Sequence, residues 1–232
     1  DCLLSRGLGD VYKRQTYTNP LKAVEFFRKT GCDALAISYG TMHGASKGKG
    51  VKLRKEIAIA IKECMMHENL FGVLVSHGSS TVPGYIVEEI NALGGNIQNA
   101  HGISIEELKA AIPCGIGKIN VDTDIRLAVT RNMKEYFAQH PEKRNSPSIG
   151  GVYQLLEEKR EQFDPRAFLP PIMDTVMYGM VPDKDRAELV EVIEKGVKEA
   201  IGTLIVEFGS YGKAPLVEQV SLEEMAERYK RM

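Results

Sequence analysis

Short apolar runs alternate with amphipathic segments over residues 16–141 of the chain. The runs lie at residues 34–38, 73–76 and 118–121, and the segments between them carry apolar side chains every three or four positions. Continuous apolar runs of this length predict strands buried in a parallel sheet, whereas the wider spacing predicts helices. Each intervening segment is long enough for a right-handed parallel connection. The pattern therefore predicts an α/β fold built from three β/α units.

Local signals mark the ends of several predicted helices. Asn19 before Pro20 is an N-cap followed by a proline suited to the first helical position, and Gly31 ends that helix. Ser104 and Glu107 form an S-x-x-E pattern, which predicts a capping box. The apolar spacing predicts further helices over residues 57–65, 83–93 and 125–137, and residues 122–124 could merely cap the last of these.

The pattern loosens beyond residue 140. Helices are predicted over residues 152–162, 183–201 and 222–229, with less regular links between them. We therefore expect residues 16–141 to carry the strands and their loops, and residues 142–232 to form a helical C-terminal extension. The extension would pack on the first part or on a partner subunit, and solvated helices are the alternative.

Composition narrows the class of protein. The 232 residues are 43% hydrophobic and 26% charged with a net charge of −1, which suits one soluble globular domain or most of a larger one. Basic and acidic residues are interspersed, so we expect no nucleic-acid partner. No apolar stretch approaches the roughly 20 residues of a membrane span, so we expect no membrane partner. The four cysteines lie far apart, which predicts a reducing, cytoplasmic location.

Residues 1–15 do not continue the pattern. They have no usable apolar period, and Asp10-Val11-Tyr12-Lys13-Arg14-Gln15 can be back-translated as GAT GTG TAT AAG AGA CAG, which looks like a transposase adapter used in library preparation. A leader peptide is the competing interpretation, but the segment lacks a long apolar core and a small-residue cleavage pattern. We therefore expect residues 1–15 to be an artefact, the natural sequence to begin near Thr16, and the upstream coding sequence to be missing.

Candidate chemistry follows the strands. His77, Gly78, Ser79 and Ser80 come directly after the second apolar run. A histidine can ligate a metal, and a glycine lets backbone N–H groups and neighbouring hydroxyls approach a phosphate closely. The alternative is a histidine at the edge of the core beside an ordinary strand-to-helix turn. His43, in the loop after the first run, has the same setting with lysines added.

A polar residue also interrupts the third run. Asn120 lies within an otherwise apolar strand, where a buried amide would need partners that a ligand could provide. Because parallel strands place their carboxyl ends at one edge of a sheet, we expect His43, His77 and Asn120 to converge. Convergence favours a metal and phosphate site over three unrelated turns.

These loops resemble those of the class II, metal-dependent fructose-bisphosphate aldolases. The strongest matches, in the family's order and at similar separations, are Gly40-Thr41-Met42-His43-Gly44-Ala45, Ser76-His77-Gly78-Ser79-Ser80 and Lys118-Ile119-Asn120-Val121-Asp122-Thr123-Asp124. The similarity runs from about Thr16 to the end of the chain. The ending, from Phe208-Gly209-Ser210 through residues 221–229, looks most like the subtype associated with the Calvin cycle, although residues 145–162 and 178–201 look longer than in that subtype.

The resemblance implies a fold and a set of binding residues. The fold would be a TIM (β/α)8 barrel, with about the last three β/α units and the C-terminal helical extension present in this chain. The implied cofactor is Zn²⁺, with His43 and His77 as metal ligands, and a monovalent cation near the phosphate site is allowed. The parent protein would be a homodimer or homotetramer. The dihydroxyacetone phosphate part of a sugar-phosphate substrate would be held by Gly44, Gly78, Ser79, Ser80, Asn120, Val121, Asp122 and Thr123.

The implied reaction is the reversible aldol cleavage of fructose 1,6-bisphosphate to dihydroxyacetone phosphate and glyceraldehyde 3-phosphate, with zinc stabilising the enediolate as a Lewis acid. The family's proton-transferring aspartate and another zinc-binding histidine would belong to the missing N-terminal part. No catalytic residue is therefore expected in this chain, which should be inactive alone. The alternatives are a related ketose-bisphosphate (tagatose-type) aldolase, a non-catalytic sugar-phosphate or metal-binding remnant, and zinc-assisted hydrolysis.

Overall fold

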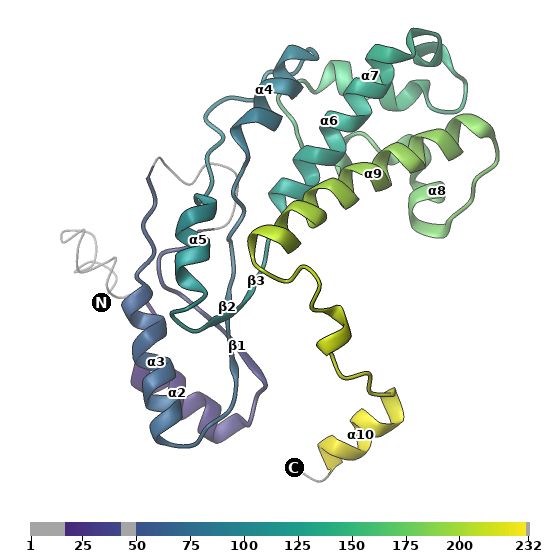
Figure 1. Ribbon diagram of the computed structural model, residues 1–232. Coiled ribbons are helices and arrows are strands. Elements are labelled where there is room, and N and C mark those ends of the chain that lie inside the picture. Colours follow the sequence, from purple (N-terminus) through teal and green to yellow (C-terminus); the bar gives the residue numbers. More distant parts are fainter. Residues whose placement is uncertain (1–16, 43–49, 231–232) are drawn as a thin grey trace, which may run out of the picture.

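A computed structural model of the chain describes residues 17–42 and 50–230, and it combines helices with a small parallel sheet (Figure 1). The strands are β1 (Ala34–Ile37), β2 (Val73–Ser76) and β3 (Ile116–Ile119), with β2 in the centre. Both pairings are parallel, as the sequence predicts: Ala34 lies opposite Val73, and Leu74 lies opposite Ile116. All three strand ends therefore point to the same edge of the sheet.

The third strand lies two residues earlier than the sequence predicts, at Ile116–Ile119 instead of 118–121. Gly115 causes this shift. It has a φ of 110°, a conformation that glycine adopts without strain, and it returns the chain to the sheet directly before Ile116. As a result, Asn120 and Val121 belong to the loop after the strand.

Three helices cover the sheet and form its main core: α2 (Pro20–Thr30), α3 (Lys55–His67) and α5 (Ile105–Ala111). The Asn19 side chain accepts a hydrogen bond from the N–H of Lys22 (3.2 Å), and Gly31 ends α2 in the left-handed conformation, which confirms the predicted caps. Side chains from all three helices share one buried core with the strand residues Leu74 and Ile116, among them Phe27, Ile61, Met65 and Leu108.

Only half of the predicted capping box forms on α5. The Ser104 hydroxyl accepts a hydrogen bond from the N–H of Glu107 (3.2 Å). The Glu107 carboxylate does not return to Ser104; it accepts from the N–H of Leu53 (2.7 Å) and from Lys55 Nζ (2.5 Å). These contacts lower the pKa of Glu107, with the Lys55 ammonium as the largest cause. The side chain thus fastens α5 to the segment before α3.

A long helix, α6 (Thr123–Gln139), joins the sheet to the helical part of the molecule. Its first turns pack against α4 (Gly84–Ala92), with Leu127 and Ala128 buried beside Val82 and Ile86. Its later turns share a second core with residues 149–197, including Met133, Phe137, Ile149, Phe168, Ile172 and Leu189. The helix therefore contributes to the cores on both sides of residue 141.

Helix α9 (Lys184–Glu207) lies along α6 (Figure 1). At the crossing, a Cβ on Gly196 would stand 2.9 Å from the Val129 backbone, so glycine allows the two helices to approach closely. The C-terminal segment thus packs on the preceding part of the chain, which is one of the two predicted arrangements. The helix extends six residues beyond the predicted end at 201, because Gly209 (φ 73°) is the first following residue to adopt a left-handed conformation.

Shorter elements complete the C-terminal part. A 3-10 turn at Pro141–Asn145 leads from α6 to α7 (Gly150–Glu158), and turns at Pro165–Ala167 and Pro170–Ile172 join α7 to α8 (Met173–Tyr178). After a further turn at Ala214–Leu216, α10 (Leu222–Lys230) ends the described chain with no buried residue, and its Tyr229 hydroxyl donates to Asp33 (2.7 Å). Among the described helices, none is both long and apolar enough to cross a membrane.

Candidate functional site

Two of the three predicted loops meet at the carboxyl edge of the sheet. Because β2 and β3 are neighbours, their ends are linked by backbone hydrogen bonds: Asn120 N–H donates to Ser76 O (2.9 Å), and Ser79 N–H donates to Asn120 O (3.3 Å). Gly78, with a φ of 64°, makes the turn between them. The arrangement brings His77 and Asn120 together, as the sequence predicts.

The Asn120 side chain joins a histidine to a lysine. Its amide nitrogen lies 3.1 Å from Nε2 and 3.3 Å from Nδ1 of His77, and its carbonyl oxygen accepts from Lys118 Nζ. The sequence predicted a buried amide in need of a ligand. The burial was predicted wrongly, because Asn120 has left the strand, is only half-buried, and has these two exposed side chains as partners; its role toward a ligand stays a prediction.

The side chain of Ser80, in the loop after β2, caps the start of α6. Its buried hydroxyl accepts hydrogen bonds from the N–H groups of Asp122 (3.2 Å) and Thr123 (3.0 Å). The Asp122 side chain makes no capping hydrogen bond; it pairs instead with Arg126 one turn along the helix (2.8 Å). The capping role considered for Asp122 is therefore taken by a residue 42 positions earlier.

These residues surround one cavity of about 490 Å³. The Lys118 ammonium and the amino-terminal end of a 17-residue helix, α6, contribute positive charge to it. The negative charge of Asp122 is offset by Arg126. Backbone N–H groups at a helix start, together with a lysine, favour an anionic ligand. The lining residues are His77, Gly78, Ser80, Lys118, Ile119, Asn120, Val121, Asp122 and Thr123.

Ser79 lies beneath the loop and does not line the cavity. Its hydroxyl is 2.6 Å from that of Ser76, which is itself 2.6 Å from the Tyr39 hydroxyl, and all three residues are fully buried. Burial raises the pKa of the Tyr39 phenol, the largest cause of that shift. This chain of hydroxyls supports the loop from below.

Sequence reasoning assigns no role at this site to Lys118, which lines the cavity, or to Asp124, which holds the residues that follow Ser80. The pattern predicts Lys118 only as part of the third strand, although a lysine inside an apolar run is a visible signal. It offers Asp124 only as a helix cap. Its buried carboxylate instead accepts hydrogen bonds from the N–H of Thr81 (3.0 and 3.1 Å), from the Thr81 hydroxyl and from the N–H of Val82 (3.4 Å).

The metal assignment depends partly on residues outside the described ones. His43 and Gly44 belong to residues 43–49, which the structure does not describe. Within residues 17–42 and 50–230, no group of three or more His, Cys, Asp or Glu side chains is placed to hold a metal ion. His77 offers an exposed imidazole at the edge of the cavity, so it fits as one ligand of a site that needs further donors.

The family model and the curated relatives that match this chain point to the same family. The family model for fructose-bisphosphate aldolase class-II matches residues 5–213. A fructose-bisphosphate aldolase of Giardia intestinalis is 35% identical over 95% of this chain and 55% of its own length. Those of Xanthobacter flavus and a Nostoc species are 33% and 34% identical, over 91% and 95% of the chain. The chain spans about half the length of the curated relatives it matches, since the last two are covered over 49% and 50%.

Proposed function

This chain belongs to the class II fructose-bisphosphate aldolase family, and on that basis we propose that the whole protein catalyses the reversible aldol cleavage of fructose 1,6-bisphosphate to dihydroxyacetone phosphate and glyceraldehyde 3-phosphate. The observation that carries the proposal is the cavity at the carboxyl edge of the sheet, where the loops after β2 and β3 meet beside Lys118 and the start of α6. Such a site suits the phosphate of a triose.

The cavity residues would hold the dihydroxyacetone phosphate part of the substrate. Gly78 allows close approach of the backbone, and residues 121–123 line the same cavity as Lys118. Ser80 would position the N–H groups of residues 122 and 123 through its hydroxyl. Ser79 would act from below, and Gly44 would contribute from the neighbouring loop. Binding the remote phosphate would fix the reacting carbons and exclude water around them.

We assign the metal, zinc, to His77 and His43, with the remaining ligands from the rest of the protein. Bound zinc would supply a Lewis acid that polarises the substrate carbonyl. The Asn120 amide nitrogen, a donor within hydrogen-bond reach of both ring nitrogens of His77, would have to release the ring nitrogen that binds the metal. A monovalent cation could accompany the phosphate. The proton-transferring aspartate is assigned to the part of the relatives that this chain does not span.

Membership of the family also supports a proposal for the architecture of the whole protein. The three parallel strands would be the last three of a TIM (β/α)8 barrel, with residues 142–232 as a helical extension. We place the protein nearest the Calvin-cycle subtype, as a cytoplasmic homodimer or homotetramer.

One experiment separates aldolase from the alternatives. The complete protein is incubated with zinc and dihydroxyacetone phosphate in deuterated water, and exchange of the carbon-bound proton is followed by NMR. An aldolase exchanges that proton, a zinc hydrolase releases inorganic phosphate, and a binding remnant does neither. Cleavage assays with fructose and tagatose 1,6-bisphosphates then identify the ketose. Phosphate release without exchange would overturn the proposal.

A further inference from the structure

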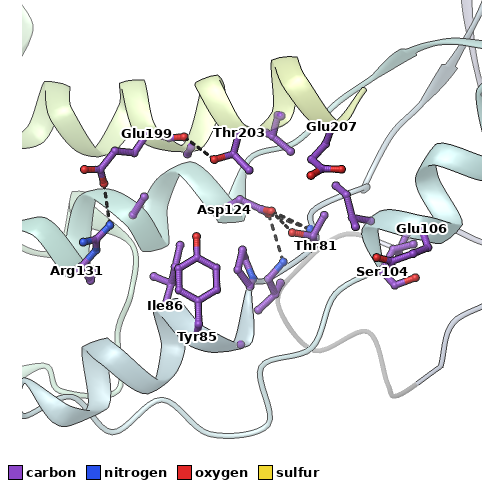
Figure 2. Close-up of a pocket in the computed structure, with 18 residues that line it drawn as sticks. Thr81, Tyr85, Ile86, Ser104, Glu106, Asp124, Arg131, Glu199, Thr203 and Glu207 are labelled. Carbon is purple, nitrogen blue, oxygen red and sulfur yellow. Dashed lines mark hydrogen bonds and ion pairs between the residues drawn. The ribbon is translucent and has the colours of Figure 1, made fainter. Parts of the chain in front are cut away.

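A second cavity, of about 380 Å³, lies between α4, α5, α6 and α9 (Figure 2). This volume falls within the usual range for small-molecule sites. Most of its wall is apolar and comes from several elements, with Val82, Ile86, Ile103, Ala128 and Leu204 among the lining residues. The Tyr85 ring points from the α4 side toward α9. The cavity shares no lining residue with the site at the sheet edge.

Negative charge dominates this cavity. Its lining includes one guanidinium, that of Arg131, and four carboxylates, those of Glu106, Asp124, Glu199 and Glu207. Arg131 is committed to Glu199, with Nη2 2.7 Å from Oε2. Asp124 is engaged by the backbone of residues 81–82, and Glu207 pairs with Lys109 (2.8 Å), so Glu106 is the carboxylate best placed to meet a ligand. A cationic group is the complement of this lining.

The two cavities lie on opposite sides of one thin wall. Ser80 and Thr123 line the site at the sheet edge, and the next residues in the chain, Thr81 and Asp124, line the second cavity. The Asp124 carboxylate joins the two segments of the wall. Anything that fills the second cavity therefore contacts the residues that follow Ser80 and Thr123 directly.

The wall is held in a strained conformation. Val82 has a φ of 52°, which is a rare state for a β-branched residue. On the other side, a Cβ on Gly102 would lie 2.2 Å from the Thr81 carbonyl oxygen, so the wall is packed against the backbone there. Strain of this kind persists only where surrounding contacts impose it, and a ligand against Val82 would add such a contact.

We propose that the second cavity binds a small apolar molecule carrying a protonated amine, and that its occupancy strengthens phosphate binding across the shared wall. The apolar lining takes the body of the ligand, and the carboxylate of Glu106 takes the amine. A ligand that holds residues 81–82 also restrains the neighbouring Ser80 and Thr123. Phosphate binding then costs less conformational entropy at these two residues. The coupling rests on the phosphate site proposed above, whereas the cavity's own ligand preference does not.

The ligand preference is tested with three probes of similar size: 2-phenylethylamine, 2-phenylethanol and 3-phenylpropanoate. Binding to the full chain is measured by NMR titration of backbone amides. We expect the amine to bind about fivefold or more tightly than the alcohol, and the carboxylate to bind worst. Equal affinities for the three probes, or shifts confined to amides outside the cavity, would overturn the proposal.

Two variants test the location. Thr203 lines the cavity at an exposed position of α9. The larger side chain of Thr203→Phe should fill the cavity and abolish amine binding, whereas Thr203→Ser should leave amine binding unchanged. Glu106→Gln should remove most of the preference for the amine over the alcohol, and Glu161→Gln, outside the cavity, should not. Unaltered amine binding in both Thr203→Phe and Glu106→Gln would place the ligand elsewhere. Circular dichroism verifies that each variant is folded.

The coupling is tested by titrating inorganic phosphate with and without saturating 2-phenylethylamine. We expect the phosphate Kd to fall by about threefold or more in the presence of the amine, and not in Thr203→Phe. An unchanged phosphate Kd would refute the coupling. Amine binding in a chain that binds no phosphate would refute both the coupling and the proposed phosphate site, while the cavity assignment would stand.

Discussion

At the residue scale, the proposed site assigns metal binding and phosphate binding to different side chains. His77 reaches the cavity with an imidazole, whereas Ser80 reaches it with a hydroxyl bound to the N–H groups of residues 122 and 123. Loss of one neutral hydrogen-bonding group typically costs about 0.5–1.5 kcal/mol. Substitution of Ser80 should therefore affect phosphate binding, whereas substitution of His77 should affect metal binding.

We predict that Ser80→Ala and Thr123→Val in the complete protein weaken dihydroxyacetone phosphate binding by about three- to tenfold, because each removes a polar group beside the phosphate. Zinc content, measured by atomic absorption, should stay normal. His77→Ala should instead lose zinc and chelator-sensitive activity. Ser221→Ala, which removes a hydroxyl bound to the Glu224 N–H on α10, serves as the matched control. Zinc loss with unchanged triose-phosphate affinity in Ser80→Ala would reverse the assignment.

A buried lysine gives a pH-dependent prediction. Lys134 on α6 is buried, and its ammonium donates to Leu156 O (3.3 Å). Burial is the main cause that lowers the pKa of Lys134 below its usual range. Between the folded and unfolded pKa values, the unfolded chain binds more protons, so this group makes stability rise with pH up to about 10.4. Below that window, the cost of the buried charge is present in full.

Lys134→Met should therefore stabilise the chain at pH 7, by about 0.5–2 kcal/mol in urea unfolding. The gain over the parent chain should shrink as the pH approaches about 10. Lys198→Met, on an exposed position of α9, controls for a change of net charge. A gain that is constant with pH would show that the ammonium is not the source.

At the element scale, the contact between α6 and α9 depends on one glycine. A Cβ at position 196 would stand 2.9 Å from both N and Cα of Val129, so any side chain must push the helices apart. Gly202, on the same helix, has no atom within 4 Å of the equivalent Cβ position. Gly196 is therefore closely packed against α6, whereas Gly202 on the same helix has open space beside it.

We predict opposite effects of one substitution at these two sites. Gly196→Ala should lower the free energy of unfolding by about 1–3 kcal/mol through overpacking. Gly202→Ala should raise it by up to about 1 kcal/mol, because alanine favours the helix over glycine without a clash. Thermal unfolding followed by circular dichroism measures both. Stabilisation of equal size at both positions would mean that helix propensity, not the crossing, controls the result.

At the scale of the whole molecule, the sheet that the described residues form leaves both of its edges open. In the part of the chain that the structure describes, β1 and β3 each pair on one side only, and Val73 and Phe71 at the start of β2 are exposed. Parallel strands normally have both faces covered, and open edges favour association. The family relatives are about twice as long as this chain, which offers an obvious cover for these surfaces.

We therefore predict that residues 16–232 alone associate and show no aldolase turnover, even with zinc. General acid–base catalysis typically contributes about 10²- to 10⁴-fold, and the aspartate assigned to it is expected elsewhere in the protein. Adding the N-terminal half of the parent protein as a separate polypeptide should restore cleavage and reduce association, as measured by a coupled assay and light scattering. Turnover by residues 16–232 alone would refute the division of the site between two halves.

The sequence by itself determined the elements and the family. Apolar runs and caps located β1, β2, α2 and the start of α5, because these signals act between residues close in the chain. Two of the three loops that the sequence selected line one cavity, since the ends of neighbouring parallel strands meet wherever the rest of the chain goes.

Only the tertiary structure decided the side-chain partners. Glu107 binds Leu53 and Lys55 instead of closing its own capping box, and Asp124 holds residues 81–82 across 42 or 43 positions of sequence. Local propensity contains no information about such distant partners, since they depend on how α5 and α6 pack against the loops. The second cavity arises in the same way, from four helices that no sequence spacing brings together.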